Sequence, residues 1–186
     1  MNRYSSVFHF QTIPSNDAMR RTIQRIRSLR YPAYTDLEHP IIDGEWGQTI
    51  EEDPQQILIA DNHGNNPWVL VFASKQRLQT LDKSQTLYLD GNFEIAPPDF
   101  TPIYIIRVEL GSKAVTAVFA LLQWTQEAYA YLLNTVEDSC VANRINYPKS
   151  QKTHVDFEKA AYMVICNVYP GAEIKGCFYH LCQVSI

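Results

Sequence analysis

The chain has 186 residues, of which 46% are hydrophobic and 12% aromatic, so it has enough apolar material for one domain with a core and is not a disordered chain. Its net charge of -4 argues against strong nonspecific nucleic-acid binding by the whole chain, although it leaves room for a local basic face. The sequence has no apolar run of about 18 residues, and residues 1–4 lead into polar sequence without a signal-like apolar region. We therefore expect no membrane association and an intracellular protein.

Residues 17–30 are predicted to form an amphipathic helix with Asn16 or Asp17 as its N-cap. Its apolar positions share one face, and the arginines lie opposite. The only basic cluster of the chain lies here: Arg20, Arg21, Arg25, Arg27 and Arg30. A solvated face is the simpler interpretation, and contact with phosphates or nuclear import is the alternative. Residues 32–55 are rich in Pro, Gly and acidic residues, so residues 1–56 are assigned as a helix and linker.

Residues 57–85 are predicted to form a hairpin and a short helix that lead into the core. Apolar runs at 57–60 and 68–72 are typical of strands, and the polar turn 61–66 joins them. Ser74 is the predicted cap of a helix that runs to about Leu81.

From residue 86 the order of predicted elements is β-β-β-α-β-α-β. The strands are expected at 86–94, 103–110, 114–122, 152–155 and 173–176, and the helices at 125–136 and 157–168. Gly111-Ser112 is the predicted tight turn between the second and third strands. Phe157 is expected on the inward face of the last helix, and Trp124, Tyr129, Tyr131 and Tyr162 are expected in the core.

Three strands joined by short turns form an antiparallel meander, and strands reached through helical crossovers lie parallel to the first. The predicted fold class is therefore α/β (α+β), with a mixed sheet in the order of the ribonuclease-H-like fold.

Two aspartates close apolar runs of this predicted sheet. Asp90 follows Leu87-Tyr88-Leu89, and Asp156 follows His154-Val155. Carboxylates on neighbouring strands can share divalent cations that carry out phosphoryl chemistry. Each aspartate has a simpler alternative: Asp90-Gly91 is also a hairpin-turn signal, and Asp156 is also a candidate helix N-cap.

The chain contains an ordered series of motifs: Asp90-Gly91-Asn92-Phe93, then Ala120-Leu121-Leu122 ahead of Gln126-Glu127-Ala128-Tyr129, then Asp156-Phe157-Glu158, then Gly176-Cys177-Phe178-Tyr179-His180. This series resembles the transposase domain of Mutator-like elements, a member of the ribonuclease-H-like DDE superfamily. The resemblance implies Asp90 and Asp156 as catalytic ligands of Mg²⁺ or Mn²⁺. It also implies DNA, as transposon ends and target, for the partner, and it favours a nuclear location. Whether the chain forms a homo-oligomer stays open.

The third acidic residue of that family, a glutamate on a later helix, has no counterpart in the sequence. Glu158 and Glu173 are the only carboxylates after Asp156, and neither follows the Cys-x-x-His element. We therefore interpret residues 86–186 as a transposase core truncated before the third acid, and we expect little or no turnover. The alternative is a non-catalytic, domesticated module that binds DNA or protein. A weaker alternative is a nuclease acting on RNA–DNA hybrids.

Cys177 and His180 have the spacing of half a zinc site. The resemblance implies that this pair supports the active site or the substrate DNA, whereas a buried thiol beside a packed imidazole is the simpler interpretation. Cys140, Cys166, Cys177 and Cys182 are expected to be free thiols or metal ligands rather than disulfides.

Overall fold

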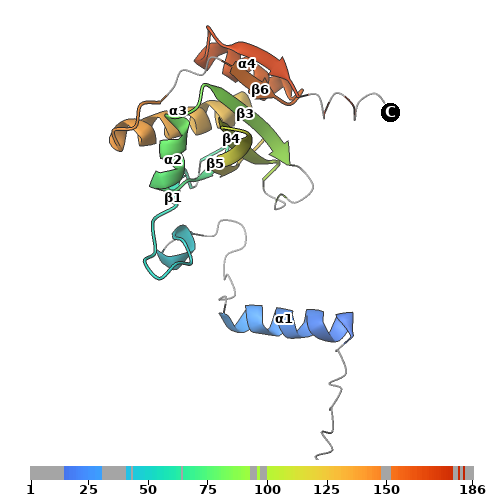
Figure 1. Ribbon diagram of the computed structural model, residues 1–186. Helices are drawn as coiled ribbons and strands as arrows, with labels where there is room; N and C mark the ends of the chain where they lie inside the picture. The colour runs from blue at the N-terminus through green and yellow to red at the C-terminus, as the bar shows by residue number, and fades with distance from the viewer. Residues whose placement is uncertain are drawn as a thin grey trace, which may run out of the picture. The chain divides into compact units, whose positions relative to one another are not determined.

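The structure is a computed structural model that describes residues 15–30, 41–42, 44–63, 65–92, 96, 100–147, 152–177, 180 and 182 (Figure 1). The chain divides into two compact units, Met1–Pro40 and Ile41–Ile186. In the first unit the described element is helix α1 (Asn16–Arg30). The Ser15 hydroxyl accepts a hydrogen bond from the N–H of Ala18, so the cap lies before the residues predicted for it. Residues 31–40 and 43 of the predicted linker lie outside the described residues.

The second unit is a mixed α/β domain. A short 3₁₀ helix spans Gly44–Gly47. The described strands are β1 (Leu58–Asp61), β2 (Leu70–Phe72), β3 (Thr86–Asn92), β4 (Ile103–Leu110), β5 (Lys113–Leu121), β6 (Lys152–Val155) and β7 (Glu173–Gly176). The described α-helices of this unit are α2 (Lys75–Leu81), α3 (Gln126–Ala142) and α4 (Lys159–Val168).

All seven described strands form one mixed sheet in the order β1-β2-β5-β4-β3-β6-β7. The pairs β3–β6 and β6–β7 are parallel, and the other neighbours are antiparallel. This strand order differs from the predicted one. The hairpin of β1 and β2, predicted to lead into the core, extends the sheet because β2 pairs with β5.

The helices cover one face of the sheet, where the main core lies. Inward side chains alternate along the strands, as Leu87 and Leu89 do on β3, and meet the buried faces of α3 and α4. Figure 1 shows α2 and α3 beside the central strands and α4 beside β6. The helix α3 continues past the predicted end at 136 because Cys140 prolongs its buried face. None of the helices built from described residues is long and apolar enough to cross a lipid bilayer.

The start of α4 differs from the prediction. Glu158 is the N-cap and the helix begins at Lys159, so Phe157 precedes the helix and its side chain is 55% exposed instead of inward. Trp124 and Tyr162, predicted as core residues, are also exposed, whereas Tyr129 is buried as expected.

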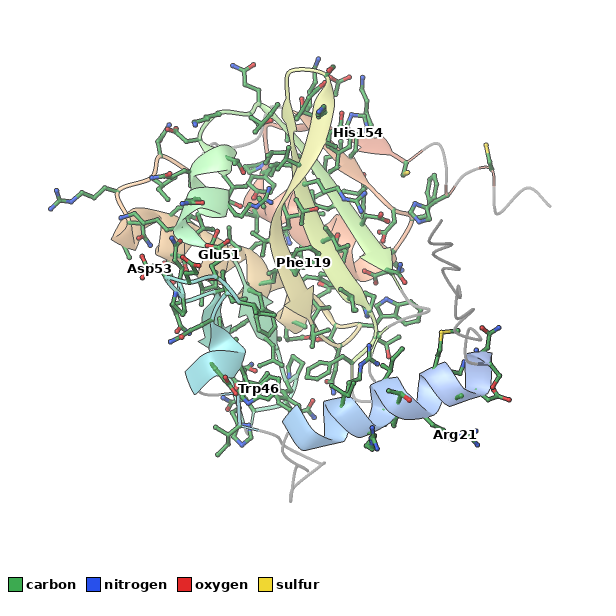
Figure 2. The ribbon with its side chains drawn as sticks, turned by 60° about the horizontal axis from the view of Figure 1, so that its bottom comes forward. Arg21, Trp46, Glu51, Asp53, Phe119 and His154 are labelled. Carbon is green, nitrogen blue, oxygen red and sulfur yellow. The ribbon has the colours of Figure 1, made fainter. Side chains whose placement is uncertain are left out.

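The opposite face of the sheet carries a smaller apolar cluster around Trp68, Leu70 and Phe100. Next to that cluster, side chains on this face are more exposed to solvent, as Phe119 is. Phe119 on β5 and His154 on β6, both labelled in Figure 2, lie between inward-facing neighbours and so point to this face. The ring of His154 stacks on Tyr88 of β3 at a centroid distance of 4.8 Å.

Candidate active site at the ends of β3 and β6

Asp90 lies inside β3 and not in a turn. It pairs with Ile105 of β4, and Gly91 pairs with Tyr104, so the hairpin-turn interpretation of Asp90-Gly91 is wrong. Because Leu89 points into the core, the alternation of the strand turns the Asp90 side chain to the opposite face of the sheet. Its carboxylate is 37% exposed and can therefore be reached by solvent and by a ligand.

Asp156 is the first residue after β6 and is buried. The strands β3 and β6 run parallel, and Leu89 of β3 is paired with Val155 of β6. Each aspartate is therefore the residue directly after one member of this pair. The Oδ2 atom of Asp156 accepts a hydrogen bond of 3.1 Å from the N–H of Gly91, the residue after Asp90. The structure therefore places the backbone next to Asp90, near the end of β3, in contact with Asp156, which directly follows β6.

The second carboxylate oxygen of Asp156 organises the turn into α4. Its Oδ1 atom accepts a hydrogen bond of 3.2 Å from the N–H of Glu158. Glu158 in turn accepts from the N–H groups of Ala160 and Ala161, so the N-cap of α4 is Glu158. The interpretation of Asp156 as the helix N-cap is wrong, because Asp156 instead ties the end of β3 to the residue that caps the helix.

Tyr104 of β4 is a buried residue whose pKa is affected by the carboxylates of the site. Its phenol is fully buried, and burial is the largest cause that raises its pKa. The charges of Asp156, Glu158 and Asp90 raise the same pKa further. Three carboxylates from β3 and from the segment between β6 and α4 thus lie close enough for their charges to act on one phenol.

Burial of Asp156 raises the pKa of its carboxyl above the ordinary value of 3.8. Hydrogen bonds from Glu158 and Gly91 oppose this effect, the Glu158 charge adds to it, and His180 opposes it. Because the folded-state pKa lies above the unfolded one, ionisation of this group opposes folding. Its favourable contribution is complete below the unfolded pKa and is lost as the pH rises through the folded pKa.

We expect a carboxyl-detected NMR titration of the metal-free protein to give Asp156 a pKa above 3.8, for the reason of burial. A midpoint for Asp156 at or below 3.8 would show that the two hydrogen bonds outweigh burial.

Two basic side chains lie beside Asp90. The Arg107 guanidinium of β4 is 3.9 Å from Oδ2, and Nε2 of His180 is 3.5 Å from Oδ1. Sequence reasoning missed Arg107. Arg107 pairs with Tyr88, two residues before Asp90 on β3, so the contact is diagonal and depends on the register of β3 and β4. His180 comes from the Cys-x-x-His motif, which the structure thus connects to the aspartates.

The prediction of a zinc site at Cys177 and His180 stays a prediction. The N–H of Cys177 donates to the carbonyl of Val155, which anchors the segment after β7 against β6. Among the residues with described placement, no group of three or more His, Cys, Asp or Glu side chains gathers as a metal-binding cluster. The four cysteines form no disulfide with one another in the structure.

The aspartate pair fits Mg²⁺ or Mn²⁺ better than zinc. Mg²⁺ is commonly bound by one or two carboxylates together with waters and substrate phosphates, whereas zinc prefers a closed set of nitrogen and sulfur ligands. Asp90, which is partly exposed, and Asp156, which is buried and hydrogen-bonded, are the two carboxylates that would hold such an ion. Comparison with protein-family models, with curated proteins and with solved structures finds no match for this chain.

Proposed function

We propose that this chain carries the ribonuclease-H-like core of a Mutator-like transposase, whose reaction is metal-dependent cleavage and strand transfer of DNA. The observation that carries the proposal is the hydrogen bond from the N–H of Gly91, the residue after Asp90, to Asp156, because it places the two aspartate positions of the motif series on adjacent strands. The antiparallel strands β5-β4-β3, extended by the parallel strands β6 and β7, support the same fold.

Asp90 and Asp156 would hold the Mg²⁺ or Mn²⁺ ions. Such ions polarise a phosphodiester and activate the attacking oxygen. Of the two ligands, Asp156 is fixed by its hydrogen bonds, and Asp90 faces the solvent side from which DNA would approach. Arg107 lies close enough to Asp90 to donate hydrogen bonds to a phosphate placed at the pair. DNA as the partner and the nucleus as the location belong to the same proposal, since the family resemblance implies both.

A two-metal site of this kind is built from several carboxylates, of which Asp90 and Asp156 would supply two. A second candidate function is a module that binds DNA or protein without chemistry. The two candidates differ in one measurable property, since the first requires divalent metal at Asp90 and Asp156 and the second does not.

Metal binding is therefore the primary test. We expect Mg²⁺ at millimolar concentration to shift the carboxyl resonances of both aspartates and to lower the pKa of Asp156, because a nearby cation favours the charged carboxylate. The substitution Asp90→Asn is expected to weaken Mn²⁺ binding, measured by calorimetry, by about tenfold or more, which corresponds to about 1.4 kcal/mol of binding free energy. The exposed acid Glu173 gives a matched control, Glu173→Gln, which leaves binding unchanged.

Nicking of supercoiled DNA is the second readout. Any Mn²⁺-dependent nicking is expected to disappear in Asp90→Asn and to persist in Glu173→Gln. No metal response at either aspartate, together with DNA binding that survives a chelator and the Asp90→Asn change, would replace the transposase proposal by the binding module. Cleavage of RNA–DNA hybrids but not of DNA would point to a hybrid-specific nuclease.

A further inference from the structure

A cavity with aromatic side chains opens directly beside Asp156. Its volume is about 290 Å³, and it is lined by residues of the segment between β6 and α4, of α4 itself and of β7. The lining residues used below are Asp156, Phe157, Lys159, Tyr162 and Gly176. Asp156 belongs both to this cavity and to the aspartate pair, so a group bound in the cavity would lie next to the proposed reaction centre.

Phe157 forms a fixed wall of the cavity. A Cβ atom added to Gly176 would lie 2.9 Å from both Cε1 and Cζ of the Phe157 ring, which shows that the ring lies directly against the backbone of β7. The ring nevertheless keeps 55% of its surface exposed. One side is therefore held by β7 while a large part remains available to a ligand, as in a stacking platform.

The other lining residues fit a flat ligand attached to a phosphate. Tyr162 of α4 adds a second exposed aromatic ring, and Lys159 adds a positive charge at the first position of the helix. The helix N-terminus itself is not free for an anion, because the carboxylate of Glu158 already accepts from the N–H groups of Ala160 and Ala161. A phosphate near the cavity would therefore be attracted by the lysine and not by the helix dipole.

We propose that this cavity binds one unpaired nucleobase of the DNA strand that is cleaved. The base would stack on Phe157, and Tyr162 would line the cavity beside it. This inference rests on the proposed function and specifies its substrate, since a base enclosed in a duplex cannot offer its face to a side chain until it leaves the stack. The cavity volume lies at the small end of ordinary ligand sites of about 300–1,000 Å³, which suits a single base and not a base pair.

The test is the affinity for a single-stranded oligonucleotide, measured by fluorescence anisotropy in the presence of a chelator so that metal chemistry plays no part. We expect Phe157→Leu to weaken binding about 5- to 100-fold, which corresponds to the stacking of one base on an aromatic ring. The matched control is Phe119→Leu. Phe119 has a similar exposure of 48% but lies on β5 and is not among the residues that line this cavity, so its replacement leaves the stacking site intact.

A second variant displaces the ring without removing it. Gly176→Ala places its Cβ against Phe157 and is expected to weaken binding of the same oligonucleotide, whereas Gly171→Ala meets no atom within 4 Å and serves as its control. A 2-aminopurine base in the oligonucleotide is expected to lose fluorescence on binding to the unsubstituted chain but not to Phe157→Leu, because stacking quenches it.

The outcomes separate this inference from the proposed function. Equal affinity of Phe157→Leu, Gly176→Ala and the unsubstituted chain, or no preference for a single strand over the duplex, would overturn the base-binding proposal while leaving metal binding at Asp90 in place. Conversely, full metal affinity in the Asp90→Asn variant would overturn the proposed function. It would not change the oligonucleotide affinity measured in chelator. Thermal unfolding followed by circular dichroism checks that each variant is folded.

Discussion

The substitution Leu132→Ala is expected to lower the free energy of unfolding by about 2–5 kcal/mol, the range measured for deleting a buried leucine side chain. Leu132 lies on α3 and is completely buried in the main core, where the helix covers the sheet. The loss combines the transfer free energy of the removed methyl groups with the cavity that they leave. Since domains of this size are stable by about 5–15 kcal/mol, one such change removes a large share of the total.

Val141 provides the control on the same helix. Its side chain is 67% exposed, so Val141→Ala is expected to change the free energy of unfolding by no more than about 0.5 kcal/mol. Urea unfolding with linear extrapolation measures both variants, and unchanged m-values show that the same cooperative unit unfolds. Similar effects of the two substitutions would mean that α3 does not pack on the sheet through its Leu132 face, and the sheet order around Asp90 would lose its support.

Local signals allowed much of the fold to be predicted from the sequence. The hydroxyls of Ser74 and Thr125 each accept a hydrogen bond from the backbone N–H three residues further along the chain, as expected of helix caps. Gly111 has a φ of +61° in the two-residue connection of β4 and β5, which is the conformation that favours glycine in a tight turn. These features depend on a few neighbouring residues, so the sequence contains them directly.

The surroundings of the candidate site could not be predicted in the same way. The approach of Arg107 to Asp90 depends on strand register, and that of His180 depends on where the chain returns after β7. The position of Phe157 depends on which of two carboxylates, Asp156 or Glu158, caps the start of α4. Glu158 caps the helix, so the helix begins two residues later than predicted and the ring of Phe157 stays outside it. Where two neighbouring residues are almost equally suited to start a helix, tertiary contacts decide between them, and these contacts cannot be predicted from the local sequence.

The two aspartates of the site are expected to differ in their contribution to folding although both are proposed to bind the metal. Asp156→Ala leaves the N–H groups of Gly91 and Glu158 without their acceptors, and we expect it to lower the free energy of unfolding by about 1–3 kcal/mol. Part of the cost of these lost bonds is offset because an ionised carboxylate no longer has to be buried. Asp90→Ala removes only two long contacts of a half-exposed side chain, so we expect a change within about 0.5 kcal/mol.

Urea unfolding in chelator measures this difference, and calorimetry with Mn²⁺ shows whether both variants lose the metal. A large loss of stability in Asp156→Ala with intact Mn²⁺ binding would identify Asp156 as a purely structural residue that joins β3 to the cap of α4. Loss of Mn²⁺ binding in both variants, with loss of stability in only one, is the result expected of a metal ligand pair. In that arrangement Asp156 is held rigid by the fold, and Asp90 remains accessible to the substrate.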